Sequence, residues 1–347
     1  MRIQKLNPSA IDLPLVIFGT SGLGNLFVVL PEEVKMEIVK QCLIHSPGRI
    51  IFDSAGKYGA GLALESLGRC LKALNVQPGK VVVSNKLGWL RTELKTPEPT
   101  FETGVWRDLK HDAVQKISYE GIIDCFNQGN ELLQGFVPQM VSVHDPDEYL
   151  ATANNSEQEA RLYQDILEAY RALADLKLRG KVSSVGVGAK NWRIIARIAQ
   201  DVKLDWVMIA NSMTLMNHPQ DLLNFMSELE KQDIQIINSA VFHSGFLIGG
   251  SYYDYKLVEK GLLGSERLFR WRDEFFGLCK DFNIHPAEVC VQFALSAPGV
   301  KSIALNTTNP NRVKENLAMA HAVVPQEFWI QMAKKDLIGF YDLKQLQ

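Results

Sequence analysis

The stretch that decides the fold is residues 50–74, which read IIFDSAGKYGAGLALESLGRCLKAL. A short apolar run at 50–52 stops at an acidic residue, and a longer pattern typical of a helix follows at 61–74. The chain on both sides repeats this unit. Short strand-like runs occur at eight places: 15–18, 50–52, 81–83, 137–143, 182–187, 206–209, 234–237 and 300–304.

Strands that alternate with helices are parallel and are joined by right-handed crossovers. Eight such units without a central reversal predict an α/β fold, a single (β/α)8 TIM barrel over residues 1–347. The alternative is an open doubly wound sheet, which would carry GxGxxG after its first strand. Residues 19–24, GTSGLG, match that pattern only loosely.

Helix signals are clearest at 157–178, where Ser156 and Glu159 form a predicted capping box. Two connections are unusually long, 87–118 after the third strand and 248–265 after the seventh. Long loops in compact domains often bind ligands or act as lids. In a barrel both loops would lie on the carboxyl-terminal face, where active sites form.

Composition excludes several classes of protein. The 347 residues include 37 Lys and Arg against 39 Asp and Glu, so no broad basic surface for nucleic acid or anionic lipid is expected. No apolar run approaches the ~18–20 residues of a membrane span, and no signal peptide is evident. Five dispersed Cys favour reduced thiols. We therefore expect a cytoplasmic protein without a membrane or nucleic-acid partner, whose oligomeric state the sequence does not indicate.

Four titratable residues stand where predicted strands end. Asp53 follows the second strand and Tyr58 lies in the loop after it, Lys86 follows the third strand, and His144 follows the fourth. Neighbouring barrel strands lie about 5 Å apart, so these side chains can converge at one rim.

Such a set predicts proton transfer beside a carbonyl or alcohol. A tyrosine with a pKa near ~10 is a poor acid or base at neutral pH, and a nearby Lys⁺ is expected to lower that pKa. Asp53 would hold Lys86, and His144 would align a substrate oxygen. No metal is required. The hydride for carbonyl–alcohol interconversion must then come from a cofactor.

Each residue also has a structural interpretation. Asp53 could only cap a turn, Tyr58 could pack, and Lys86 could be a solvated charge. His144 could be a loop residue or, with Asp145, part of a metal-dependent hydrolase. The histidines that would have to complete such a metal site, His218 and His243, follow the sixth and seventh strands. Joint placement on one rim favours the catalytic interpretation.

A phosphate site is predicted after the last two strands. Asn309 would cap a helix at 311–321 with Pro310 at its first position, and Arg312 would stand in its first turn. Residues 242–247, FHSGFL, offer a glycine and backbone amides for a pyrophosphate. The alternative is an ordinary capped helix with a surface arginine.

These residues and motifs resemble the aldo-keto reductase superfamily. The matching motifs, spread from residue 19 to 316, are FDSAGKYG (52–59), SNKLG (84–88), VHDPD (143–147), KVSSVGVG (181–188) and NTTNPNRVKENL (306–317). The resemblance implies a (β/α)8 barrel, a nicotinamide cofactor extended across its carboxyl-terminal face, and hydride transfer. It assigns the tetrad Asp53, Tyr58, Lys86 and His144, with Tyr58 as the acid or base.

The resemblance also implies a set of NAD(P)(H) contacts. They are Gly19, Thr20, Asn211, Phe242, Ser244, Gly245, Leu247, Asn306, Thr307, Arg312 and Asn316. Several positions depart from the family pattern. Gly188 and Ala189 stand where many members have Ser-Asn, and Ser239 replaces a stacking Tyr. Asn306 and Thr307 replace the Lys-Ser of many NADP-preferring relatives, which slightly favours NAD or dual use.

Three loops are similar to those of L-fucose, D-threo-aldose and L-galactose dehydrogenases, namely GLGNLF (22–27), VHDPDEY (143–149) and AVFHSGFL (240–247). This resemblance implies oxidation of a sugar hemiacetal at C1. Asn25, Trp89 and His243 are the expected substrate contacts. The alternatives are a general NADPH-dependent aldehyde or ketone reductase and a non-catalytic, nicotinamide-binding regulatory subunit. Lys57 is unusual before the tyrosine and either perturbs the Tyr58 pKa or points to solvent.

Overall fold

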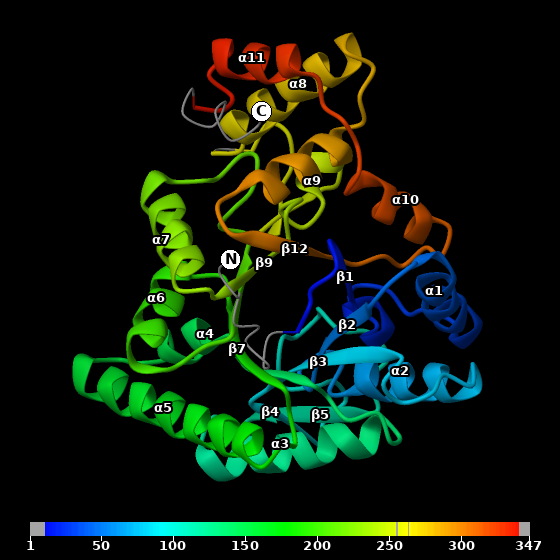
Figure 1. The fold of residues 1–347 in the computed structure, drawn as a ribbon, viewed down its shortest axis with the longest axis vertical. Helices are drawn as coiled ribbons and strands as arrows, with labels where there is room; N and C mark the ends of the chain where they lie inside the picture. Colours follow the sequence, from blue (N-terminus) through cyan, green and yellow to red (C-terminus); the bar gives the residue numbers. More distant parts are fainter. Residues whose placement is uncertain (1–10, 255, 263, 340–347) are drawn as a thin grey trace, which may run out of the picture.

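The computed structural model describes residues 11–254, 256–262 and 264–339, and in it eight parallel strands close into a barrel (Figure 1). Strands that are consecutive around the barrel are also consecutive along the chain. They are β1 (Val16–Gly19), β2 (Ile50–Ala55), β3 (Val81–Leu87), β6 (Met140–His144), β7 (Ser184–Ala189), β8 (Trp206–Ala210), β9 (Gln235–Ser239) and β12 (Val300–Leu305). The predicted barrel is confirmed, and each predicted strand coincides with one of these.

Helices surround the strands (Figure 1). Their bounds are α1 (Glu32–His45), α2 (Leu62–Ala73), α3 (Tyr119–Leu132), α4 (Pro146–Leu150), α5 (Ser156–Leu178), α6 (Trp192–Asp201), α7 (Gln220–Lys231), α8 (Glu266–Asp281), α9 (Pro286–Ser296), α10 (Arg312–Met319) and α11 (Gln326–Lys334). Helices α8 and α11 pack together at one end of the molecule.

Two predicted helix starts were wrong by about one residue. Helix α5 begins at Ser156 and is capped by Asn155, whose side chain accepts a hydrogen bond from the Gln158 amide. Helix α10 begins at Arg312 and not at 311, because the Asn309 side chain instead accepts from the amide of Asn311, two residues further on. Asn commonly forms this local turn and so competes with the cap.

The two long connections contain regular structure of their own. In the first, β4 (Trp89–Glu93) and β5 (His111–Gln115) form an antiparallel hairpin that packs against α3. In the second, the 3-10 turn η2 (Phe246–Ile248) precedes the short pair β10 (Tyr252–Tyr253) and β11 (Lys256–Leu257). Both connections therefore contain short antiparallel strand pairs, which lie in loops that follow the carboxyl-terminal ends of barrel strands.

The barrel interior is apolar towards the amino-terminal ends of the strands. Its buried cluster contains Ile11, Ile17, Ile51, Val82, Met140, Trp206, Met208 and Ile237. Side chains alternate along a strand, so a residue two or four positions later faces the same side. Asp53 thus follows Ile51 inward, as Lys86 follows Val82 and His144 follows Met140. The alternation that fills the core also directs these three polar groups into the barrel mouth.

The Trp206 ring fills the barrel interior so closely that the neighbouring strand β7 has no room for a side chain at one position. A Cβ atom built on Gly186 would lie 2.2 Å from the Trp206 ring, closer than real contacts allow. A Cβ on Gly188, two residues along the same strand, would lie 3.6 Å from the Lys86 side chain, which is ordinary contact. Strand β7 therefore needs glycine at 186 and not, for packing, at 188.

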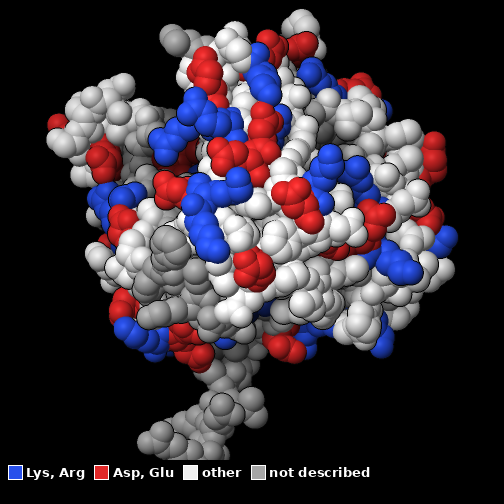
Figure 2. All heavy atoms as spheres, turned by 90° about the horizontal axis from the view of Figure 1, so that it is seen from above, with Lys and Arg blue, Asp and Glu red and all other residues white. Residues whose placement is uncertain are grey.

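The outer surface carries mixed charge. Lys and Arg side chains are interspersed with Asp and Glu on the face that Figure 2 shows. Within the described ranges, no helix combines the length and the apolar character needed to cross a membrane.

Gly186→Ala should destabilise the barrel, because the new methyl group forces Trp206 to move within a filled interior. We expect a loss of about 1–3 kcal/mol in the free energy of unfolding, the usual range for overpacking. Urea denaturation measures it. Gly188→Ala is the matched control and should stay near the wild-type value. Equal losses in the two variants would contradict the packing argument.

Candidate active site

A buried ion pair lies at the centre of the barrel mouth. The Lys86 ammonium bonds Oδ2 of Asp53, and Ser84 Oγ donates to Oδ1 of the same carboxylate at 2.9 Å. Asp53 and Lys86 are each only 4% exposed. Asp53 is paired in register with Ser84, and Lys86 stands two residues further along β3. The long lysine side chain reaches back to the carboxylate from that position.

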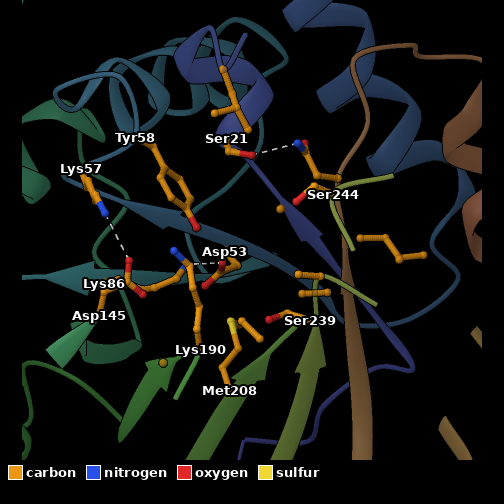
Figure 3. A pocket seen from close by; sticks show the side chains of 18 of the residues that line it. Ser21, Asp53, Lys57, Tyr58, Lys86, Asp145, Lys190, Met208, Ser239 and Ser244 are labelled. Carbon is orange, nitrogen blue, oxygen red and sulfur yellow. Dashed lines mark hydrogen bonds and ion pairs between the residues drawn. The ribbon is translucent and has the colours of Figure 1, made fainter. Parts of the chain in front are cut away.

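Tyr58 lies over this ion pair. Lys86 Nζ is 4.8 Å from the centroid of the Tyr58 ring, and the ring meets His144 edge to face at 5.4 Å. Figure 3 shows the phenol directed towards Lys86 and Asp53. The structure thus brings together the four residues that the sequence predicts as catalytic.

Two glycines make room for the tyrosine loop. The backbone of Gly59 has a φ of +60°, and a Cβ atom there would lie 2.3 Å from the carbonyl oxygen of Gly24. Gly24 belongs to η1 (Ser21–Gly24), the turn after β1. The close backbone approach of these two loops fixes where the Tyr58 ring enters the mouth.

Burial dominates the acidity of the phenol. Removal from water raises the pKa of Tyr58 to about 12, although the Lys86 ammonium acts in the opposite direction. The negative charge of Asp53 adds to the increase because it offsets much of the effect of Lys86. The predicted effect of Lys86, a lowering of the Tyr58 pKa, is confirmed, but burial, which the sequence did not indicate, outweighs it. Tyr58 is protonated at neutral pH in this structure.

The other two groups have well-defined charges at neutral pH. Burial acts against the charge of Lys86, but Asp53 and Tyr58 outweigh it and raise the pKa of Lys86 above its ordinary value. Burial, followed by the ammonium groups of Lys57 and Lys86, holds the pKa of His144 well below 6.5. The site therefore presents a phenol, an ammonium ion and a neutral imidazole.

These groups line a cavity of about 470 Å³. One side of it is apolar, formed by Leu26, Phe27, Val105 and Trp106. Of the predicted cofactor residues, five line the cavity: Gly19, Phe242, Ser244, Gly245 and Asn306. Asn306 also donates to Ser21 Oγ at 2.9 Å, which joins the loops after β12 and β1 (Figure 3).

The residues around the cavity fit a nicotinamide nucleotide. Asn211 follows the cavity-lining Ala210, and its buried Oδ1 has no hydrogen-bond partner among the described residues. Gly245 has a φ of +94°, and a Cβ there would meet nothing within 4 Å. An uncommitted amide oxygen and an open glycine turn suit a carboxamide and a phosphate, respectively.

The remaining predicted cofactor residues lie outside the cavity. Thr20 donates its hydroxyl to the backbone of Asp53 at 3.0 Å, and Leu247 is fully buried in the core. The Thr307 hydroxyl bonds the backbone of Asn309. Arg312 is exposed on α10, and Asn316 lies one turn further along the same helix.

The predicted substrate contacts hold loops together and do not line the cavity. The buried Asn25 amide donates to the Arg107 carbonyl at 3.1 Å and accepts from the Leu30 amide at 3.3 Å. Trp89 stacks near Phe101. His243 is buried between Thr214 Oγ1 at 2.7 Å and Asp254 Oδ1 at 2.6 Å.

Sequence reasoning missed several cavity residues. Trp106 and Glu102 come from the first long connection, whereas Asp145 and Lys190 follow β6 and β7. The sequence did offer one indication for Asp145, because it directly follows the predicted catalytic residue His144. Lys57, which was expected either to perturb the Tyr58 pKa or to point to solvent, is 4% exposed and lines the cavity, so the solvent-facing alternative is wrong.

The metal-hydrolase alternative gains no support from the geometry. Within the described residues, no three His, Cys, Asp or Glu side chains are grouped so that they could hold a metal ion. His218 stacks on Phe293 and bonds the carbonyl of Thr214 instead.

A closed parallel barrel with this tetrad beside a cavity of about 470 Å³ is the arrangement of a barrel oxidoreductase. The chain belongs to the aldo/keto reductase family, whose model matches residues 15–336, and it is an NAD(P)-dependent oxidoreductase.

Known proteins similar to this chain include three dehydrogenases. Pyridoxal 4-dehydrogenase of Microbacterium luteolum is 24% identical over 97% of this chain and 98% of its own length. D-threo-aldose 1-dehydrogenase of a Pseudomonas species is 23% identical over 95% of this chain and 96% of its own length. L-galactose dehydrogenase of Arabidopsis thaliana is 19% identical over 92% of this chain and 88% of its own length.

Solved structures share the fold. A holo-form aldo-keto reductase from Bacillus halodurans aligns with a TM-score of 0.67 and 16% identity over 92% of this chain and 91% of its own. A glycerol dehydrogenase from Gluconobacter oxydans aligns with a TM-score of 0.66 and 18% identity over 94% and 93%.

Lys86→Met should leave the Asp53 carboxylate buried without its counter-ion. Breaking a buried pair on one side costs about 3–5 kcal/mol, and we expect a loss of that size in the free energy of unfolding at pH 7. Chemical denaturation measures it. Adding Asp53→Asn to the variant removes the orphaned charge and should recover part of the stability. A double variant as unstable as the single one would mean that the ion pair is not the cause.

Proposed function

We propose that this chain is an aldose 1-dehydrogenase, which oxidises a cyclic hemiacetal at C1 to a lactone with NAD(P)⁺. The observation that carries the proposal is the Tyr58 phenol, placed over Lys86 and against His144 at the wall of the cavity. The names of two relatives add support, because both act on sugars.

The residues of this chain divide the work of proton transfer. The neutral imidazole of His144 hydrogen-bonds the substrate oxygen and aligns it with Tyr58. Tyr58 Oη takes the proton of the C1 hydroxyl, and Lys86 stabilises the tyrosinate that must form first. Asp53 holds the ammonium in place. In the reverse direction Tyr58 gives its proton to the carbonyl oxygen.

The nicotinamide, when bound, accepts the hydride that leaves C1. Asn211 and Ser239 would hold its ring, and Ser244, Gly245 and Asn306 would hold its phosphates. Asn306 and Thr307 supply no charge for a 2′-phosphate, which leaves the exposed Arg312 for that role. We therefore propose use of NAD, or of both cofactors.

The substrate class follows from chemistry that the named relatives share. Aldoses and pyridoxal each carry a carbonyl that a neighbouring hydroxyl can close into a cyclic hemiacetal. The apolar side of the cavity, with Trp106, suits the face of such a ring. The carboxylates of Asp145 and Glu102 on the polar side accept hydrogen bonds from hydroxyl groups. We infer a neutral, hydroxylated ring as substrate.

A panel of free aldoses, pyridoxal and simple aldehydes, each with NAD⁺, NADP⁺, NADH or NADPH, tests the function through nicotinamide absorbance. We expect oxidation of at least one aldose. The oxidation rate should rise between pH 7 and 10, because Tyr58, with a pKa of about 12, must first lose its proton. Reduction of aldehydes by NADPH alone would favour the general reductase, and no turnover at all would favour a regulatory subunit.

Tyr58→Phe should remove the acid and base while it preserves the ring packing against His144 and Trp106. We expect turnover to fall by about 10²–10⁴-fold, the usual contribution of a general acid or base. Cofactor binding, followed by fluorescence titration, should be almost unchanged. Tyr149→Phe is the control, since that phenol bonds Asp165 outside the cavity. Near-normal turnover in Tyr58→Phe would refute the assigned role.

Arg312→Ala should distinguish the cofactors. Since Arg312 is exposed on α10, its loss should weaken binding of NADP more than that of NAD, because only NADP carries the 2′-phosphate. Titration of both nucleotides against the variant provides the measurement. Equal weakening would show that Arg312 does not contact that phosphate.

A further inference from the structure

The residue before the tyrosine is a buried lysine surrounded by carboxylates. Lys57 Nζ lies 2.8 Å from Glu102 Oε1, 2.8 Å from Glu148 Oε2 and 3.3 Å from Asp145 Oδ2. Glu148 also binds Lys190 at 2.6 Å. We name these five residues the Lys57 cluster. Its members come from the loops after β2, β4, β6 and β7 and, for Glu148, from helix α4.

Lys57 has no hydrogen to spare for a substrate. An ammonium group carries three N–H donors, and three carboxylates surround this one. Those carboxylates raise the pKa of Lys57 above its ordinary value despite burial, so the charge persists. Whatever Lys57 contributes to the reaction must therefore act through the groups that it holds.

One of those groups is the neighbour of the candidate catalytic histidine. Lys57 precedes Tyr58 and Asp145 follows His144, the last residue of β6. The Lys57–Asp145 ion pair therefore joins the loop that carries Tyr58 to the end of the strand that carries His144 (Figure 3). The two rings meet edge to face at 5.4 Å. The ion pair thus fixes the spacing of the two groups that have to hold one substrate oxygen.

A second group is the connection between β4 and β5. Glu102 uses one oxygen for Lys57 and the other for Trp106 Nε1, at 2.6 Å. The Trp106 ring in turn packs against Tyr58 at 5.8 Å. Lys57, Glu102, Trp106 and Tyr58 therefore form a closed ring of contacts at the cavity wall.

We propose that Lys57 is a positioning residue, which fastens the 94–110 connection over Tyr58 and sets the distance between Tyr58 and His144. The alternative is that other contacts hold this connection without Lys57. Phe27 N bonds Val105 O at 2.9 Å, and Arg107 N bonds Asn25 O at 3.0 Å. The proposal rests on the family's carbonyl–alcohol chemistry and not on a particular sugar.

Lys57→Met and Lys57→Arg test the proposal in kinetics. Lys40→Met is the control, because Lys40 is exposed on α1 and pairs there with Glu37, far along the chain from the Lys57 cluster. We use any substrate that the panel identifies. Misplacement of reacting groups costs up to about 10²-fold. We expect kcat of Lys57→Met to fall by that order while the KM for cofactor stays within about twofold, and Lys57→Arg to recover much of the loss.

The pH profile gives a readout that a merely structural role would not move. His144 is faced by Tyr58, Lys57, Lys86, Asp145, Glu148 and Lys190. Loss of the Lys57 charge removes one of the cations that hold the pKa of His144 down. The acid limb of kcat should therefore move to higher pH in Lys57→Met, and should stay in place in Lys57→Arg.

Trypsin cleavage tests the same proposal without any substrate. The exposed Lys95 and Arg107 lie within the 94–110 connection, and Arg161 on α5 is an exposed reference site. Cleavage follows the population of the open state. We expect Lys57→Met to be cut at Lys95 or Arg107 about tenfold faster, with cleavage at Arg161 unchanged.

Wild-type kcat together with wild-type cleavage in Lys57→Met would overturn the proposal, because the connection would then be held in place without Lys57. If Lys57→Met fails to fold, Glu102→Gln decides, because it keeps an acceptor for Trp106 but loses the ion pair. It should then show faster cleavage at Lys95 or Arg107, and unchanged cleavage would count against the proposal. Absence of sugar oxidation by the wild type would refute the proposed function alone.

Discussion

The site depends on one buried ion pair, between Asp53 and Lys86. A charge taken out of water is costly unless a partner and hydrogen bonds compensate it. Here Ser84 completes the carboxylate, and the ammonium remains available to the phenol above it. Without Asp53, burial would favour a neutral Lys86, and nothing would then stabilise a tyrosinate. The Asp53 carboxylate therefore acts on the reaction indirectly, because it keeps Lys86 charged.

The barrel supplies this arrangement through strand periodicity alone. Apolar side chains on alternate positions fill the lower interior, and the same alternation places Asp53, Lys86 and His144 in the mouth. Parallel strands in register then bring residues that are distant in sequence within contact. Loops contribute what strands cannot, namely the tyrosine, the cavity wall and the Lys57 cluster.

Sequence patterns predicted the repeated strand–helix units and the polar residues directly after the strands. The eight strands were found because each is a short apolar run, and the tetrad because its members follow three consecutive strands. The patterns failed where long-range contact decides. Nothing near Asn25 indicates that its amide is held by Arg107, 82 residues away, and burial of Lys57 required carboxylates 45 to 91 residues away. The sequence correctly indicated that Lys86 lowers the pKa of Tyr58, but it could not show the loss of water that raises this pKa by more.

Trp206, which fills the barrel interior, limits the routes by which ligands can reach the cavity. Among the described residues, Trp206 and Met208 belong to the apolar cluster that fills the barrel interior below the ion pair. We therefore expect nucleotide and substrate to enter from the carboxyl-terminal face, where the cavity lies. Whichever of the two lies nearer the apolar cluster should then arrive first and depart last.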